Sequence, residues 1–135
     1  MTEKHENARI LIAEDDESNV LLLRMLLENA GYANLHSITD PRRLLEVVEQ
    51  AEPDILLLDL HMPHLSGLEV MEGLRGRDAG DHSFPIVILS GDTSPHTRDQ
   101  ALSLGASDFL VKPFDLNAVL ECVDAQLRAH LGDRA

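Results

Sequence analysis

Short apolar runs alternate along the chain with longer segments that carry apolar residues at helical spacing. Arg9–Ala13, Ile55–Leu58 and Pro85–Leu89 are nearly continuous apolar runs, which are typical of strands buried on both faces of a sheet. Asn34–Ile38 alternates polar and apolar residues and predicts a strand nearer the edge of that sheet. Phe109–Val111 predicts a last short strand. The pattern therefore indicates five strands, separated by segments long enough to form helices.

Capping and breaking residues bound the predicted helices. Residues 18–30 are rich in helix formers, and Gly31 follows them as a stop. Asp40–Pro41 and Ser94–Pro95 each join a preferred N-cap residue to a proline at the first helical position, and Asp115 caps the last helix. The helical segments predicted by these signals are 18–30, 41–52, 67–74, 95–104 and 116–131. The apolar face of the last one is predicted to be Leu116, Val119, Leu120, Val123, Leu127 and Leu131.

Strands that alternate with helices predict a mostly parallel sheet, covered by helices on both faces and built with right-handed crossovers. This is the doubly wound α/β class. We expect one domain over residues 9–131, with short tails at 1–8 and 132–135, because no internal repeat or linker interrupts the pattern. A strand order of 2-1-3-4-5 would place the first and third strands beside each other where the order reverses.

Composition and charge narrow the function further. The chain has 135 residues, of which 44% are hydrophobic and 26% charged, as in ordinary globular proteins. Its net charge of −13 would repel a phosphate backbone, so we do not expect direct nucleic-acid binding. The longest wholly apolar runs have four residues, whereas a membrane span needs roughly 18. No secretory signal is visible, and the single Cys122 excludes an intrachain disulfide, so a cytoplasmic protein is expected.

Polar residues stand at the carboxyl ends of four of the predicted strands. They are Glu14, Asp15 and Asp16 after the first strand, Asp59 after the third, Ser90 after the fourth and Lys112 after the fifth. Ligands of open α/β sheets bind at this edge, and crowded carboxylates repel one another unless a cation neutralises them. Mg²⁺ is the natural partner for such oxygen ligands. A carboxylate held beside Mg²⁺ and a lysine can act as the nucleophile of phosphoryl transfer.

The ordered set of motifs resembles the receiver domain of bacterial two-component response regulators, which has the chemotaxis-regulator-like, flavodoxin-like fold. The resemblance extends from about Arg9 to about His130. Its fragments are Ile10–Asp15, Leu57–Pro63 with Gly67, Ile88–Gly91, Leu104–Ala106 and Phe109–Phe114. Each fragment alone would be a weak signal, but the ordered set at these intervals is highly specific.

The resemblance implies a role for each matching residue. Asp59 corresponds to the phosphoacceptor, Lys112 to the lysine of the site and Ser90 to the hydroxyl residue. Mg²⁺ would be bound by Asp15, Asp59 and the backbone carbonyl of His61, with Glu14 acting through water. Asp16 is then the surplus residue of the acidic cluster, a solvated or capping carboxylate. The Lys112–Pro113 peptide bond is expected to be cis.

The implied partners are a histidine kinase or phosphotransfer protein that donates the phosphoryl group, and a downstream protein or output domain. A second copy of the domain is a further possible partner, in a dimer that forms on phosphorylation. The domain would catalyse only its own phosphorylation and dephosphorylation rather than turn over a substrate. Phosphorylation is expected to act through Ser90 and Phe109 on the surface formed by the fourth helix, fifth strand and fifth helix.

The sequence departs from the family pattern at a few positions. Phe109 lacks the hydroxyl of the commoner tyrosine, so a switch at this position must work by packing alone. Ser66 replaces an aspartate that is not a ligand, which puts little in doubt. His61 and Asp92, two residues after Asp59 and Ser90, occupy positions that resemble the pair tuning hydrolysis of the phosphoryl group.

Other readings of the same residues remain open. An Mg²⁺-dependent phosphatase with an aspartate nucleophile would share the site, although it normally has a second aspartate where His61 stands. A flavin-binding module of the same fold would lack its usual stacking residues, because the chain has no tryptophan and one tyrosine. His61 and His64 at loose spacing are a weak transition-metal candidate. Cys122 is predicted to lie off the apolar face of its helix and to be inert.

Overall fold

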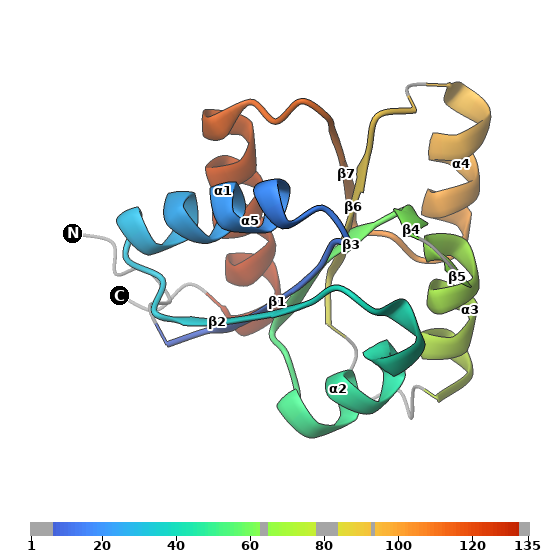
Figure 1. Cartoon of the computed structure of the whole chain (residues 1–135), viewed down its shortest axis with the longest axis horizontal. Helices are drawn as coiled ribbons and strands as arrows, with labels where there is room; N and C mark the ends of the chain where they lie inside the picture. The colour runs from blue at the N-terminus through green and yellow to red at the C-terminus, as the bar shows by residue number, and fades with distance from the viewer. Residues whose placement is uncertain (1–6, 63–64, 78–83, 93, 133–135) are drawn as a thin grey trace.

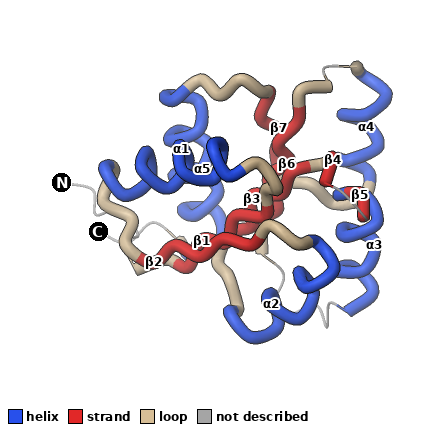
Figure 2. The backbone as a smooth tube through the Cα atoms, viewed as in Figure 1, coloured by secondary structure: helices blue, strands red, loops and turns tan. Residues whose placement is uncertain are grey.

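The computed structural model describes residues 7–62, 65–77, 84–92 and 94–132. Its centre is a five-stranded parallel sheet with the order β2-β1-β3-β6-β7, which is the predicted order 2-1-3-4-5 in terms of the main-sheet strands (Figures 1 and 2). The strands are β1 (Arg9–Ala13), β2 (Asn34–Ile38), β3 (Ile55–Asp59), β6 (Ile86–Ser90) and β7 (Asp108–Val111). The labels β4 (His61–Met62) and β5 (Leu65–Ser66) belong to a small antiparallel ribbon outside this sheet.

Helices cover both faces of the sheet, as Figure 1 shows. They are α1 (Glu17–Asn29), α2 (Leu44–Ala51), α3 (Gly67–Arg77), α4 (Pro95–Ser103) and α5 (Leu116–Leu131). Helices α1 and α5 lie on one face, whereas α2, α3 and α4 lie on the other. The doubly wound class is therefore confirmed. No helix within the described ranges is long and apolar enough to cross a membrane.

Successive strand residues point into two different cores. In β1, Ile10 and Ile12 join the core beneath α1 and α5, whereas Leu11 and Ala13 join the core beneath the other three helices. Every residue of β3 and β6 is buried. Because both faces are covered, an apolar side chain is favoured at every strand position, which explains the continuous apolar runs. The edge strand β2 has one buried residue, Leu35, in agreement with its alternating sequence.

Cap residues set where several elements begin. The Asp16 carboxylate accepts a hydrogen bond from the Ser18 N–H at 2.8 Å and caps α1. Asp115 in the same way accepts from two backbone N–H groups of α5. Asp40 caps a short 3₁₀ helix, η1 (Pro41–Arg43), so the predicted helix from residue 41 divides into η1 and α2.

Four features of the fold differ from the sequence prediction. The β4–β5 ribbon was not predicted, and α3 runs to Arg77 rather than ending at residue 74. Leu116 is 47% exposed, because the first turn of α5 lies at the carboxyl edge, where the strands beneath the helix end. Cys122, predicted to lie off the apolar face, belongs instead to the core, where its thiol donates a hydrogen bond to Asp108 Oδ2 at 3.3 Å. Burial and this carboxylate raise the pKa of Cys122 to about 12, which disfavours the nucleophilic thiolate form at neutral pH.

Candidate functional site

The carboxyl edge of the sheet gathers the polar residues that the sequence singles out. Asp59 and Ser90 are the last residues of β3 and β6, and Glu14 follows β1 directly. Carboxylate oxygens of Glu14, Asp15 and Asp59 all lie within 4.8 Å of one another. Glu14 and Asp59 are buried, with 0% and 2% of their surface exposed, whereas Asp15 is exposed. We call these three residues the acidic cluster.

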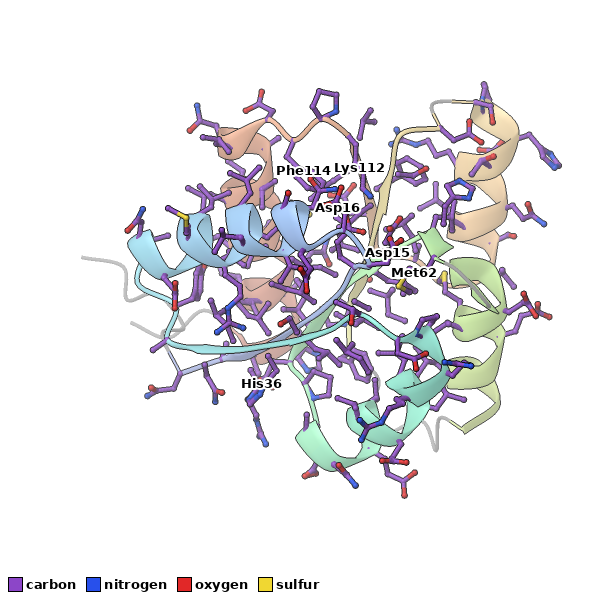
Figure 3. All side chains as sticks on the ribbon, viewed as in Figure 1. Asp15, Asp16, His36, Met62, Lys112 and Phe114 are labelled. Atoms are coloured by element: carbon purple, nitrogen blue, oxygen red, sulfur yellow. The ribbon has the colours of Figure 1, made fainter. Side chains whose placement is uncertain are left out.

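Lys112 places one positive charge against this cluster. Its Nζ lies 2.8 Å from Glu14 Oε1 and 3.3 Å from Asp59 Oδ2. The Lys112 N–H donates to the Ser90 carbonyl at 2.8 Å, which extends the β6–β7 pairing by one residue. The Lys112–Pro113 bond is cis, as expected. In Figure 3, Asp15 and Lys112 lie together at the edge where α1 begins, and His36 lies well away from them.

Asn19 is a site residue that sequence reasoning missed. Its Nδ2 donates to Glu14 Oε1 at 2.7 Å, from the first turn of α1. Asn19 and Lys112 therefore hold the Glu14 carboxylate from two sides. A buried carboxylate requires such partners, because an unpaired charge in an apolar interior is strongly unfavourable. The only signal in the sequence was an amide residue five positions after Glu14, which by itself is common.

The electrostatics of the cluster are unbalanced. Burial raises the pKa of Asp59 to about 8, and the neighbouring Glu14 carboxyl adds to this rise. The His61 N–H, which donates to Asp59 Oδ1 at 3.1 Å, and the Lys112 ammonium act in the opposite direction. Burial alone would lower the pKa of Lys112, but its contacts with Glu14 and Asp59 outweigh this effect and raise it. One ammonium thus contacts two of the three clustered carboxyl groups, and the cluster favours a further cation.

The oxygen donors of this cluster match the ligands that Mg²⁺ prefers. Within the described residues, no other group of three or more histidine, cysteine or acidic side chains comes together closely enough to hold an ion. The His61 side chain is exposed, and its backbone N–H contacts Asp59. The alternative metal site made of His61 and His64 cannot be compared with this cluster, because Pro63 and His64 lie outside the described residues.

Ser90 and Phe109 lie on neighbouring strands and are both buried. Ser90 Oγ accepts a hydrogen bond from the Asp92 N–H at 3.0 Å. The Asp92 carboxylate accepts in turn from the Ser94 N–H and the Thr97 hydroxyl, each at 2.8 Å. These hydrogen bonds lower the pKa of Asp92, and the bond from the Ser94 N–H has the largest effect. No pattern in the sequence had singled out Thr97.

The fold and this edge define a class of proteins: doubly wound α/β domains with a buried acidic pocket beside a lysine at the carboxyl ends of their strands. Residues 10–124 match the response regulator receiver domain, and the chain therefore belongs to this family. Family membership supports the receiver interpretation over the phosphatase and flavin-binding alternatives. Receiver domains of two-component systems generally act as phosphorylated signal switches.

Individual relatives agree with this assignment. The chain is 36% identical over 122 residues to the alkaline phosphatase synthesis transcriptional regulatory protein PhoP of Bacillus subtilis, covering 90% of this chain and 49% of PhoP. It is 34% identical over 122 residues to the CAI-1 autoinducer sensor kinase/phosphatase CqsS of Vibrio cholerae, covering 90% of this chain and 18% of CqsS. The chain thus spans about half the length of PhoP and less than a fifth of CqsS.

A solved structure gives the same result. The chemotaxis protein CheY4 of Vibrio cholerae superimposes with a TM-score of 0.80 at 28% identity, covering 89% of this chain and 98% of the CheY4 chain. The structural similarity therefore extends over most of this chain and nearly all of CheY4.

Proposed function

We propose that Asp59 accepts a phosphoryl group from a histidine kinase or phosphotransfer protein in the presence of Mg²⁺. The observation that carries this proposal is the convergence of the acidic cluster with Lys112 at one edge of the sheet. Of the three carboxylates, Asp59 stands at the end of the central strand β3 and contacts both the His61 N–H and Lys112. It is therefore the carboxylate best placed to be the nucleophile.

The chain's own residues have separate tasks in this reaction. An Asp59 oxygen attacks the phosphorus atom, the bond from phosphorus to the donor group breaks, and the donor keeps that electron pair. Lys112 supplies a positive charge for the transferred oxygens, and Ser90 supplies a hydroxyl donor at the neighbouring strand end. Asn19 and Lys112 together keep Glu14 in place.

Mg²⁺ would be held by Asp15, Asp59 and the His61 carbonyl, with Glu14 acting through water. When bound, the ion would neutralise charge on the carboxylates and on the transferred phosphoryl group. The carboxylates fit this ion because they provide hard oxygen donors and more negative charge than Lys112 balances. Asp16 has a different task, since its carboxylate caps α1.

We further infer that the domain lies in the cytoplasm, extends over residues 9–131, and passes its state to a downstream protein or output domain. The net charge of −13 supports a protein partner rather than direct nucleic-acid binding by this domain. The sensor kinase/phosphatase among its relatives also supports a protein partner. Ser90 and Phe109 would carry the response toward the surface formed by α4, β7 and α5. A phosphorylation-dependent dimer on that surface is one form the output can take.

The test is incubation with acetyl phosphate and Mg²⁺, followed by intact-mass measurement. We expect the added mass of one phosphoryl group on the parent protein and none on Asp59→Asn. Asp16→Asn is the matched control, because it removes a neighbouring carboxylate that lies outside the cluster. Undiminished labelling of Asp59→Asn, or full labelling after removal of divalent metal, would contradict the proposal.

A further inference from the structure

Helix α4 is connected to both of the residues expected to switch, to Ser90 through Asp92 and to Phe109 through Arg98. At its start, Asp92 lies between Ser90 and the helix. One turn later, the Arg98 guanidinium carbon lies 5.9 Å from the centre of the Phe109 ring. Neither Thr97 nor Arg98 belongs to the acidic cluster. The helix therefore links two buried residues of different strands through side-chain contacts.

The first half of the connection consists of hydrogen bonds. Ser90 Oγ is fully buried and accepts the Asp92 N–H at 3.0 Å. The Asp92 carboxylate then accepts the Thr97 hydroxyl, and Thr97 Oγ1 also receives a hydrogen bond from the Ser94 hydroxyl at 3.0 Å. A displacement of the Ser90 hydroxyl would therefore remove the acceptor of the Asp92 N–H, and the Asp92 carboxylate is hydrogen-bonded to the first turn of α4.

The second half is a cation–π contact. Thr97 and Arg98 are adjacent in the helix, so a movement of Thr97 moves the guanidinium group with it. Arg98 is exposed, while Phe109 is 7% exposed and packed in the core beneath α4. A guanidinium within about 6 Å of a ring centre is attracted to the face of the ring. Phe109 has no hydroxyl with which to form a directional bond, and Arg98 provides a directional contact in its place.

We propose that Asp92, Thr97 and Arg98 form a relay that transmits the state of the Ser90 hydroxyl to Phe109. This inference rests on the proposed function, because a phosphoryl group on Asp59 is what would draw the Ser90 hydroxyl toward it. The Asp92 N–H then loses its acceptor, the first turn of α4 shifts, and Arg98 leaves the Phe109 ring free to repack. Thr97 and Arg98 act here as positioning residues, since neither touches the acidic cluster.

The three phenylalanines of the chain make the relay measurable. Ring-¹³C phenylalanine gives signals from Phe84, Phe109 and Phe114, which single Phe→Leu variants assign. Beryllofluoride, a mimic of the aspartyl phosphate, should shift the Phe109 signal of the parent protein. Thr97→Val and Arg98→Met should each lose at least half of that shift, although Asp59 still accepts phosphate from acetyl phosphate at the parent level.

Two further variants serve as controls. Ser103→Ala removes a hydroxyl from the other end of α4, where it donates to the Gln100 carbonyl, and should keep the full Phe109 shift. Arg98→Lys keeps a cation and should retain more of the shift than Arg98→Met. If the Phe84 and Phe114 signals of a variant stay where they are in the parent protein, the fold of that variant is intact.

The outcomes separate the relay from the function on which it rests. A full Phe109 shift in both Thr97→Val and Arg98→Met would overturn the relay while leaving phosphorylation of Asp59 intact. Equal losses in Arg98→Lys and Arg98→Met would overturn the cation–π step. A parent protein that accepts no phosphoryl group on Asp59 would overturn the proposed function and the relay together.

Discussion

Asp59 and Asp92 are carboxylates at the same edge of the sheet, but their surroundings have opposite effects on them. Burial and the neighbouring Glu14 carboxyl raise the pKa of Asp59 to about 8. The Ser94 N–H and the Thr97 hydroxyl lower the pKa of Asp92. The ionised form is therefore unfavourable at one position and favourable at the other.

The difference follows from what each carboxylate can contact without a ligand. Asp92 has donors from the first turn of α4, which satisfy its charge within the chain. Asp59 has one backbone N–H and a lysine that it shares with Glu14. A carboxylate with enough donors of its own stays ionised without a ligand, whereas one left short of positive charge is prepared for a cation or a reaction.

The largest expected effect is that of Asp59→Asn on stability. Between the ordinary pKa of 3.8 and the folded value of about 8, the folded protein binds more protons than the unfolded chain. The contribution of Asp59 to the unfolding free energy therefore falls as pH rises through this range. One pKa unit corresponds to about 1.4 kcal/mol, so the variant should be more stable than the parent by roughly 2–5 kcal/mol at pH 8.

Urea unfolding followed by far-ultraviolet circular dichroism at a series of pH values measures this difference. Asp16→Asn is again the control, since it removes an equal charge outside the acidic cluster. A variant no more stable than the parent at pH 8 would show that the burial of Asp59 has no energetic cost, and the contrast with Asp92 would disappear.

The next effect is that of Mg²⁺. An ion that binds the folded state alone stabilises it by about 2.7 kcal/mol at a concentration of 100 times its dissociation constant. We expect thermal unfolding at pH 8 to shift upward with Mg²⁺, to return on chelation, and to respond much less in Asp59→Asn. Asp92→Asn should respond as the parent does. Equal stabilisation of Asp59→Asn would place the ion elsewhere.

A smaller effect is expected at the start of α4. Ser94 Oγ accepts the Thr97 N–H at 3.3 Å as the N-cap, so Ser94→Ala should cost about 1 kcal/mol of unfolding free energy. Because this cap contacts no member of the acidic cluster, the cost should be the same with and without Mg²⁺. Urea unfolding under both conditions measures it, and a cost that changes with Mg²⁺ would contradict the separation of the two regions.

The smallest effect is that of Asp92→Asn, and its pH dependence has the opposite sign. A lowered folded pKa gives stability that is present above 3.8 and is lost as pH falls through the folded value. The variant should therefore be slightly less stable than the parent near neutral pH, with the difference vanishing in acid. The same unfolding series measures this trend, and a difference that grows as pH falls would reverse our interpretation.

Local pattern and capping chemistry were sufficient to predict most of the fold. The apolar runs predict strands buried on both faces, because a parallel sheet covered by helices leaves few polar positions. Asp16, Ser94 and Asp115 cap the helices that follow them. Such a cap can be predicted from the sequence because its side-chain oxygen accepts from a backbone N–H only two or three residues further on. The sequence also placed Asp59 and Ser90 at strand ends on one edge.

Tertiary structure decided the contacts between residues far apart in the sequence. Lys112 and Glu14 are separated by 98 positions, and no local pattern predicts the 2.8 Å contact between them. The contacts of Asn19 with Glu14 and of Arg98 with Phe109 likewise depend on which side chains the fold places beside them. The pKa of Asp59 also depends on the tertiary structure, because burial and the Glu14 carboxyl raise it. The sequence by itself determined which charged groups the site contains, whereas the packed structure added Asn19 and defines the distances on which the charge states depend.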